Sequence, residues 1–163
     1  EPSRTEATIM GIATSMREYL DGLHVHYDVS THDRTSTSAR TAQAGHIPGR
    51  QLAKGVVLKK DGGYMVAVLP SNRLIDLAET GDVVGEKVRL ASEAEASALF
   101  PDCDTGAIPV VAEPYHVPCV VDDQLDQRED IYFEGGDHST LVHVSGADFA
   151  RLTSSYPHGH ITI

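Results

Sequence analysis

The sequence predicts a mixed α/β fold of the α+β type, with a mixed, partly barrel-like β-sheet and peripheral helices. Strand-like and helix-like segments are interspersed along the chain, and several strands follow one another at hairpin distances. Neither a GxGxxG motif nor a P-loop is present, which disfavours a doubly wound nucleotide-binding fold. At 163 residues, 40% of them hydrophobic, the chain suits one domain with one core.

The helices are placed by their caps and by the spacing of their apolar residues. The first and the fourth open with capping boxes, Ser15 to Glu18 and Ser92 to Glu95, and the last is capped by Ser145. The second stops at a glycine, and the third turns its leucines inward. In chain order, the expected helices are residues 15–22, 37–44, 72–80, 92–100 and 145–152.

The strands are placed by alternation, or as short apolar runs between turn residues. The first alternates, and the next two form a hairpin around Asp61-Gly62-Gly63. The expected strands are residues 24–29, 56–58, 64–69, 87–90, 117–122, 131–135 and 140–144. Residues 1–9 are expected to be a leader or an expression remnant, and residues 10–163 a single domain.

The charge of the chain limits its partners. A formal net charge of −11 disfavours a protein that grips a long stretch of nucleic acid, but leaves a short single-stranded end open. No apolar run approaches the ~18 residues that cross a bilayer, and the polar start is no signal peptide. Two cysteines without metal spacing fit a reducing cytoplasm, the expected location, and no membrane contact is expected.

The residues offer weak evidence for a metal or for a nucleophile. His24 and His26 share one face of an expected strand, but no third ligand has a useful spacing, so no metal and no cofactor are expected. The chain has no GxSxG elbow. Cys119 is expected to be an inert core residue, and the acidic neighbours of Cys103 should raise its pKa, the wrong direction for a nucleophile.

Two features allow both a structural and a functional interpretation. Lys54 opens an apolar strand, so its ammonium either reaches water or holds a negative group. Gly135 and Gly136 either form a tight hairpin turn or present their N–H groups to a ligand.

Taken in order, several segments resemble the YbaK/ProX-like aminoacyl-tRNA deacylases, the free-standing and inserted editing domains. The resemblance runs from about His24 to Leu152. It rests on AKGVVLKKDGGYMVAVLP, KVRLAS, VPCVVDDQL, FEGGDHSTLVHVS and a His32-to-Thr37 entry to a helix. The loop departs from the family's Gly-x-x-x-Pro pattern, because Gly106 precedes Pro109 by three and the first glycine position falls on Thr105.

The resemblance implies a YbaK-like editing fold and hydrolysis of the ester that joins a wrong, small amino acid to a tRNA. It implies contact with the acceptor end of the tRNA, with an aminoacyl-tRNA synthetase as a further candidate partner. Lys54 would supply a fixed positive charge, and backbone N–H groups an oxyanion hole. The implied catalytic residues are Lys54, Gly135, Gly136 and His138. The implied substrate-binding residues are His32, Thr37, Thr105, Gly106, Pro109, Asp122 and Asp137.

Two other classes of function remain open. The same pocket would suit a module that binds a free amino acid or a small anion without hydrolysis, and the altered loop favours this modestly. An acidic interaction domain that docks a basic partner is the other alternative, in which Lys54 is incidental.

Overall fold

The structure is a computed structural model that describes residues 12–32, 41, 42 and 44–163. The expected leader (1–9) and Thr37 lie outside these residues, as does most of the expected helix 37–44.

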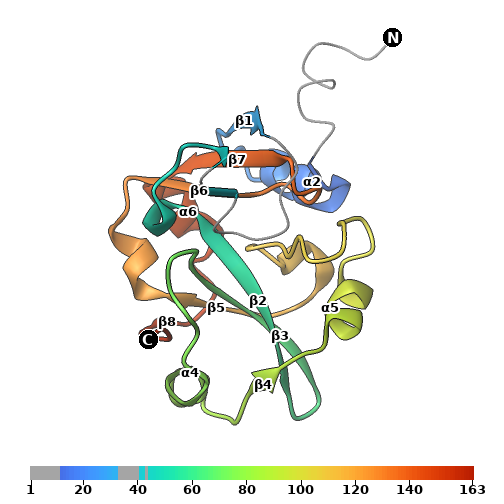
Figure 1. Ribbon diagram of the computed structural model, residues 1–163, viewed down its shortest axis with the longest axis vertical. Helices are drawn as coiled ribbons and strands as arrows, with labels where there is room; N and C mark the ends of the chain where they lie inside the picture. Colours follow the sequence, from blue (N-terminus) through green and yellow to red (C-terminus); the bar gives the residue numbers. More distant parts are fainter. Residues whose placement is uncertain (1–11, 33–40, 43) are drawn as a thin grey trace.

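A five-stranded sheet carries the hairpin that the sequence predicts. Its strands, in spatial order, are β4 (Arg89–Leu90), β2 (Ala53–Lys60), β3 (Gly63–Pro70), β5 (Cys119–Asp122) and β8 (His158–Gly159). The first three pair antiparallel, whereas β3, β5 and β8 pair in parallel. In Figure 1 the β2–β3 hairpin is the long ribbon that crosses the molecule and ends in the turn at Gly62, whose φ is 82°.

A second sheet of three antiparallel strands lies at the other end of the hairpin (Figure 1). Its order is β1 (Asp28–Thr31), β7 (Thr140–Ser145) and β6 (Asp130–Glu134). A parallel bridge between Leu52 and Tyr132 joins the two sheets just before β2. The predicted mixed α+β fold is thereby confirmed, as two sheets and without a closed barrel.

Four α-helices occur in the described part of the chain: α2 (Thr14–Gly22), α4 (Leu77–Val84), α5 (Glu93–Leu99) and α6 (Gly146–Leu152). The capping box from Ser92 to Glu95 is confirmed, and the side chain of Ser145 caps α6. The capping box predicted at Ser15 is wrong. The Ser15 N–H donates to the Asp102 carboxylate at 2.9 Å, and α2 has no side-chain cap.

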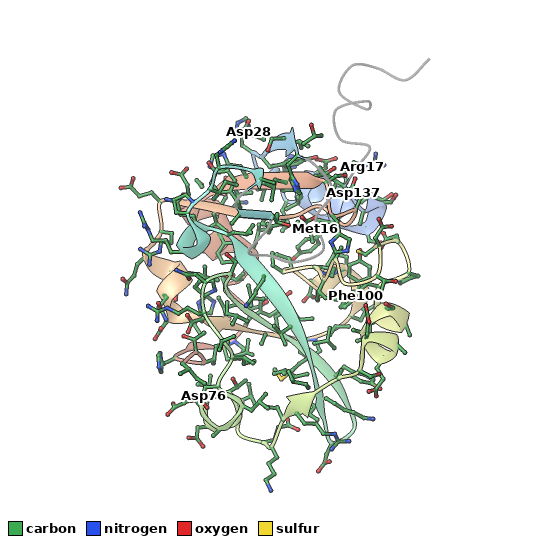
Figure 2. All side chains as sticks on the ribbon, viewed as in Figure 1. Met16, Arg17, Asp28, Asp76, Phe100 and Asp137 are labelled. Atoms are coloured by element: carbon green, nitrogen blue, oxygen red, sulfur yellow. The ribbon has the colours of Figure 1, made fainter. Side chains whose placement is uncertain are left out.

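Two of the predicted elements shift the most. Only the end of the alternating segment 24–29 becomes a strand, because His24 has a φ of 55° and β1 begins at Asp28. The expected helix 72–80 begins later, at Leu77, because Asp76 caps it by accepting from the Glu79 N–H at 3.1 Å (Figure 2 labels Asp76).

The larger sheet is buried on both faces, which explains the nearly continuous apolar runs of its central strands. Val66 and Val68 of β3 pack into the main core, together with residues of α2, α6, β6 and β7. Met65, Ala67 and Leu69 of the same strand pack into a second cluster, which α4 covers. The antiparallel register of β2 and β3, from Ala53 opposite Pro70 to Lys60 opposite Gly63, determines on which face each side chain at the start of β2 lies.

Candidate functional site

A small cavity lies where the start of β2 meets loop 101–109 and the end of β6. Its volume is about 30 Å³, enough for at least one water molecule. It is lined by Leu52, Ala53, Lys54, Gly55, Gly106, Ile108 and Glu134. The structure therefore brings together two predicted site residues, Lys54 and Gly106, with an acidic residue that sequence reasoning missed.

Lys54 lines this cavity from a backbone position that strand pairing fixes. It is the second residue of β2 and pairs with the fully buried Leu69 of β3. Its side chain is half-buried, and burial lowers the pKa of its ammonium. Among the described residues, none pairs with this ammonium. The backbone of Lys54 is thus fixed in position, and its charge has no counterion in the described part of the chain.

Glu134 brings a second charge to the same cavity. It is the last residue of β6, and its side chain is only 15% exposed. Its Oε1 accepts from the Thr41 hydroxyl at 3.4 Å and lies 3.5 Å from the His32 Nε2. Its Oε2 is buried and has no hydrogen-bond partner in the described part of the chain. Burial raises the pKa of this carboxyl above its ordinary range.

A sequence signal for Glu134 exists. Glu134 lies within the predicted strand 131–135, on the face opposite to the buried Ile131 and Phe133. It also stands next to the Gly135-Gly136 turn, where the backbone bends.

Loop 101–109 is held against the turn between β6 and β7 by two hydrogen bonds. The Asp104 N–H donates to the Gly136 carbonyl, and the His138 Nε2 contacts the Thr105 carbonyl, both at 2.7 Å. A carbonyl only accepts, so Nε2 carries the proton and Nδ1 has a lone pair in the neutral ring. Gly106 packs against this ring with a φ of 84°, which requires glycine.

The N–H groups of Gly135 and Gly136 differ in whether they are free to act as donors in the expected oxyanion hole. The Gly135 N–H donates to the Thr140 carbonyl at 2.9 Å and is therefore engaged, which corrects its expected role as a free donor. The Gly136 N–H has no acceptor among the described residues, and its φ of 124° suits glycine alone.

Asp137 shapes this turn. Its carboxylate accepts from the N–H groups of Ser139 and Thr140 at 3.0 and 2.8 Å and from the Thr140 hydroxyl at 2.9 Å. Burial raises the pKa of Asp137, but these hydrogen bonds outweigh it and leave the pKa below its ordinary value. Figure 2 labels Asp137 on the side of the molecule that carries α2.

Three further predicted site residues are not among those that line the cavity. Pro109 is buried, and its carbonyl oxygen lies against β2 at Gly55. His32 lies beside Glu134, as described above. Asp122 is fully buried at the end of β5, accepts from the Ile161 N–H at 3.2 Å and does not line the cavity.

The cysteines are poor nucleophiles. Burial is the main cause that raises the pKa of both Cys103 and Cys119 to about 11. Asp102 also raises the pKa of Cys103, as the sequence predicts, but burial is the larger cause.

One group in the described residues has the spacing of metal ligands. Asp122, Asp123 and His160 place ligand atoms within 4.8 Å of one another, but Asp123 and His160 are exposed. The His24–His26 pair does not form a strand face, because β1 begins after it. His158 is engaged by Asp126 and by the Thr153 carbonyl.

A larger cavity lies elsewhere. It measures about 620 Å³ and is lined by α4 and by residues 85–88. None of the predicted site residues lines it, so its size does not make it the better candidate. Within the described residues, no helix has the length and apolar character to cross a membrane.

Comparison with known proteins identifies the family of this chain. Residues 32–152, more than half of the chain, match the model of the aminoacyl-tRNA editing domain. A search of curated proteins found no match.

Solved structures show the same fold. Hypothetical protein APE2540 superposes with a TM-score of 0.81 at 21% identity, over 91% of this chain and 99% of its own. A candidate trans-editing enzyme for prolyl-tRNA synthetase gives 0.77 at 21%, over 93% and 99%. A candidate signal transduction protein from Marinobacter aquaeolei gives 0.70 at 20%, over 90% of this chain but 30% of its own. With the fold and the family model in agreement, this chain belongs to the aminoacyl-tRNA editing domain family.

Proposed function

We propose that this protein is a trans-editing deacylase, which hydrolyses the ester of a tRNA mischarged with a small amino acid. The observation that carries the proposal is the half-buried Lys54, which lines a cavity from the start of a paired strand and has no counterion among the described residues. Such a charge is suited to a ligand that is anionic or becomes anionic during reaction. The candidate partners are the acceptor end of the tRNA and an aminoacyl-tRNA synthetase, and the proposed location is the cytoplasm.

The size of the cavity supports a small amino acid. Its volume of about 30 Å³ lies well below the roughly 300–1,000 Å³ of typical ligand pockets. Editing is needed for such amino acids, because one methylene changes binding by only ~1–3 kcal/mol at the charging step.

Each residue of the site has its own role in the proposed ester hydrolysis. Water attacks the ester carbonyl carbon, and the carbonyl oxygen becomes an oxyanion. The carbonyl then re-forms, the bond to the ribose oxygen breaks, and that oxygen takes the proton that the water gives up. Lys54 stabilises the oxyanion or holds the terminal phosphate, and the Gly136 N–H is a second donor. His138 donates from Nε2 to Thr105, so its Nδ1 is left to orient the attacking water.

The test compares Lys54→Met with the wild type on tRNAs charged with alanine, cysteine, serine or proline. The expected result is hydrolysis of at least one ester by the wild type, and a rate ~10²–10³-fold lower for Lys54→Met. Lys60→Met is the matched control, because Lys60 lies at the far end of β2, within 3.6 Å of the Glu86 carboxylate. It should retain the wild-type rate.

Two results would contradict the proposal. Equal rates for wild type and Lys54→Met would remove Lys54 from the reaction. Stabilisation of the protein by free amino acids, without hydrolysis of any tRNA ester, would favour the small-ligand binding module instead.

A further inference from the structure

Glu134 is a buried acid that the proposed reaction does not use. A carboxylate that leaves water loses its hydration, and this cost is large unless hydrogen bonds or a counterion replace it. Here Oε1 has one long hydrogen bond, from Thr41, and Oε2 has none in the described part of the chain. A native protein rarely leaves a buried charged oxygen without a partner, so a cationic group of a bound ligand would complete this site.

The charges around Glu134 indicate what kind of ligand would bind beside it. Burial is the largest influence on Glu134 and opposes the charged form of the carboxylate, whereas His32 and His138 favour that form and Asp137 opposes it. Lys54 lines the same cavity, yet its nitrogen does not approach the Glu134 oxygens within ion-pair distance. Two opposite charges thus border one small space without neutralising each other. A ligand that has both a positive and a negative group fits between them.

An aminoacyl ester has this pattern of charge. Its α-ammonium is attached to the carbon next to the reacting carbonyl, and the carbonyl oxygen becomes negative when water attacks. With the developing oxyanion or the phosphate at Lys54, the α-ammonium is the one cation of the substrate that reaches the cavity. We propose, on the basis of the proposed function, that Glu134 binds the free α-ammonium and so restricts the site to aminoacyl-tRNAs with an unblocked amino group.

The consequence is selectivity against N-acylated esters. Acylation removes the charge of the nitrogen and leaves Glu134 buried without its counterion. Loss of one hydrogen bond to a charged group should lower kcat/KM by roughly 10- to 100-fold. The excluded class includes any tRNA whose amino acid is formylated, acetylated or already joined to a peptide.

The experiment compares alanyl-tRNA with N-acetyl-alanyl-tRNA for the wild type, Glu134→Gln and Glu129→Gln. Glu129 is exposed, so its variant is the control and should keep the wild-type selectivity. The kcat/KM of the wild type should be roughly 10- to 100-fold higher for alanyl-tRNA than for N-acetyl-alanyl-tRNA. Glu134→Gln is isosteric and should lose most of that preference through slower hydrolysis of the free ester. Equal rates of the wild type on both esters would overturn the inference, whatever the folding of the variant.

A binding measurement separates this inference from the proposed function. L-alaninamide and N-acetyl-L-alaninamide are compared as ligands by thermal shift. A higher Tm with the free amide alone, lost in Glu134→Gln, supports the assignment of Glu134 even if no ester is hydrolysed. If esters are hydrolysed without preference and neither amide raises Tm, the deacylase proposal stands and the role of Glu134 is refuted.

Discussion

Gly55 is the residue that allows loop 101–109 to approach the start of β2. A β-carbon built on it would lie 2.8 Å from the Ile108 Cγ2 and 2.9 Å from the Pro109 carbonyl oxygen. Real β-carbons are almost never so close to other atoms, and one of the two neighbours is backbone, so Gly55→Ala must move the loop. The loop holds Gly106, which lines the cavity together with Lys54.

The loss of unfolding free energy in Gly55→Ala is estimated from the cost of overpacking a tight site. One added methyl group in a tight site costs about 1–3 kcal/mol of unfolding free energy. For a chain of this length each kcal/mol corresponds to roughly 2–4 °C, so Tm should fall by about 2–12 °C. Displacement of catalytic groups by a fraction of an ångström should reduce deacylation by roughly 10-fold or more. Circular dichroism melts and initial rates of deacylation measure the two effects.

Gly63→Ala is the matched control, in the same hairpin. A β-carbon on Gly63 would meet no atom within 4 Å, and its φ is not positive. Tm and rate should therefore stay at the wild-type values. If Gly55→Ala behaves like Gly63→Ala, the loop is not seated by its contact with β2, and the reasoning about the cavity fails.

Two further predictions concern the groups around the cavity. Asp137→Ala should lower the unfolding free energy by about 1–3 kcal/mol at pH 7, because three hydrogen bonds to the carboxylate are lost. The folded pKa of Asp137 is depressed, so its stabilisation is present above the unfolded pKa and lost as the pH falls below about 4. Urea unfolding at pH 7 and pH 3 should show a smaller acid effect in the variant; an equal effect would contradict this. Cys103 has a pKa of about 11, so at pH 8 iodoacetamide should label it about 10²-fold more slowly in the native than in the unfolded protein. Mass spectrometry measures this, and comparable rates would contradict burial of the thiol.

The sequence predicts the hairpin and the capped helices well, because their signals are local. Gly62 needs a positive φ in the turn, and Ser92 and Glu95 satisfy each other within one helical turn. Ser15 and Glu18 have the same spacing, yet the Ser15 N–H is satisfied by Asp102, 87 residues later. A tertiary hydrogen bond of this kind replaces a local cap and leaves no mark on the sequence.

The sequence predicts the site only in part, because tertiary contacts leave no local signal. Lys54, Gly106 and His138 were selected from their local patterns and from the resemblance, and the fold brings them to one region. Asp122 was selected with them, but its carboxylate faces the backbone of Ile161. Glu134 was missed, because its burial depends on two sheets and a loop that converge from distant parts of the sequence.

The acidity of the chain and a tRNA substrate are compatible if the contact is small. At physiological ionic strength charges are screened over about 8 Å, so most of the −11 charge acts weakly on a phosphate in the cavity. Lys54 has no described counterion, so its full charge is available at short range, where screening is least. The same acidity would repel the body of a tRNA from the remaining surface. The structure therefore fits a protein that contacts only the aminoacylated end, or one that receives the tRNA from a synthetase already holding it.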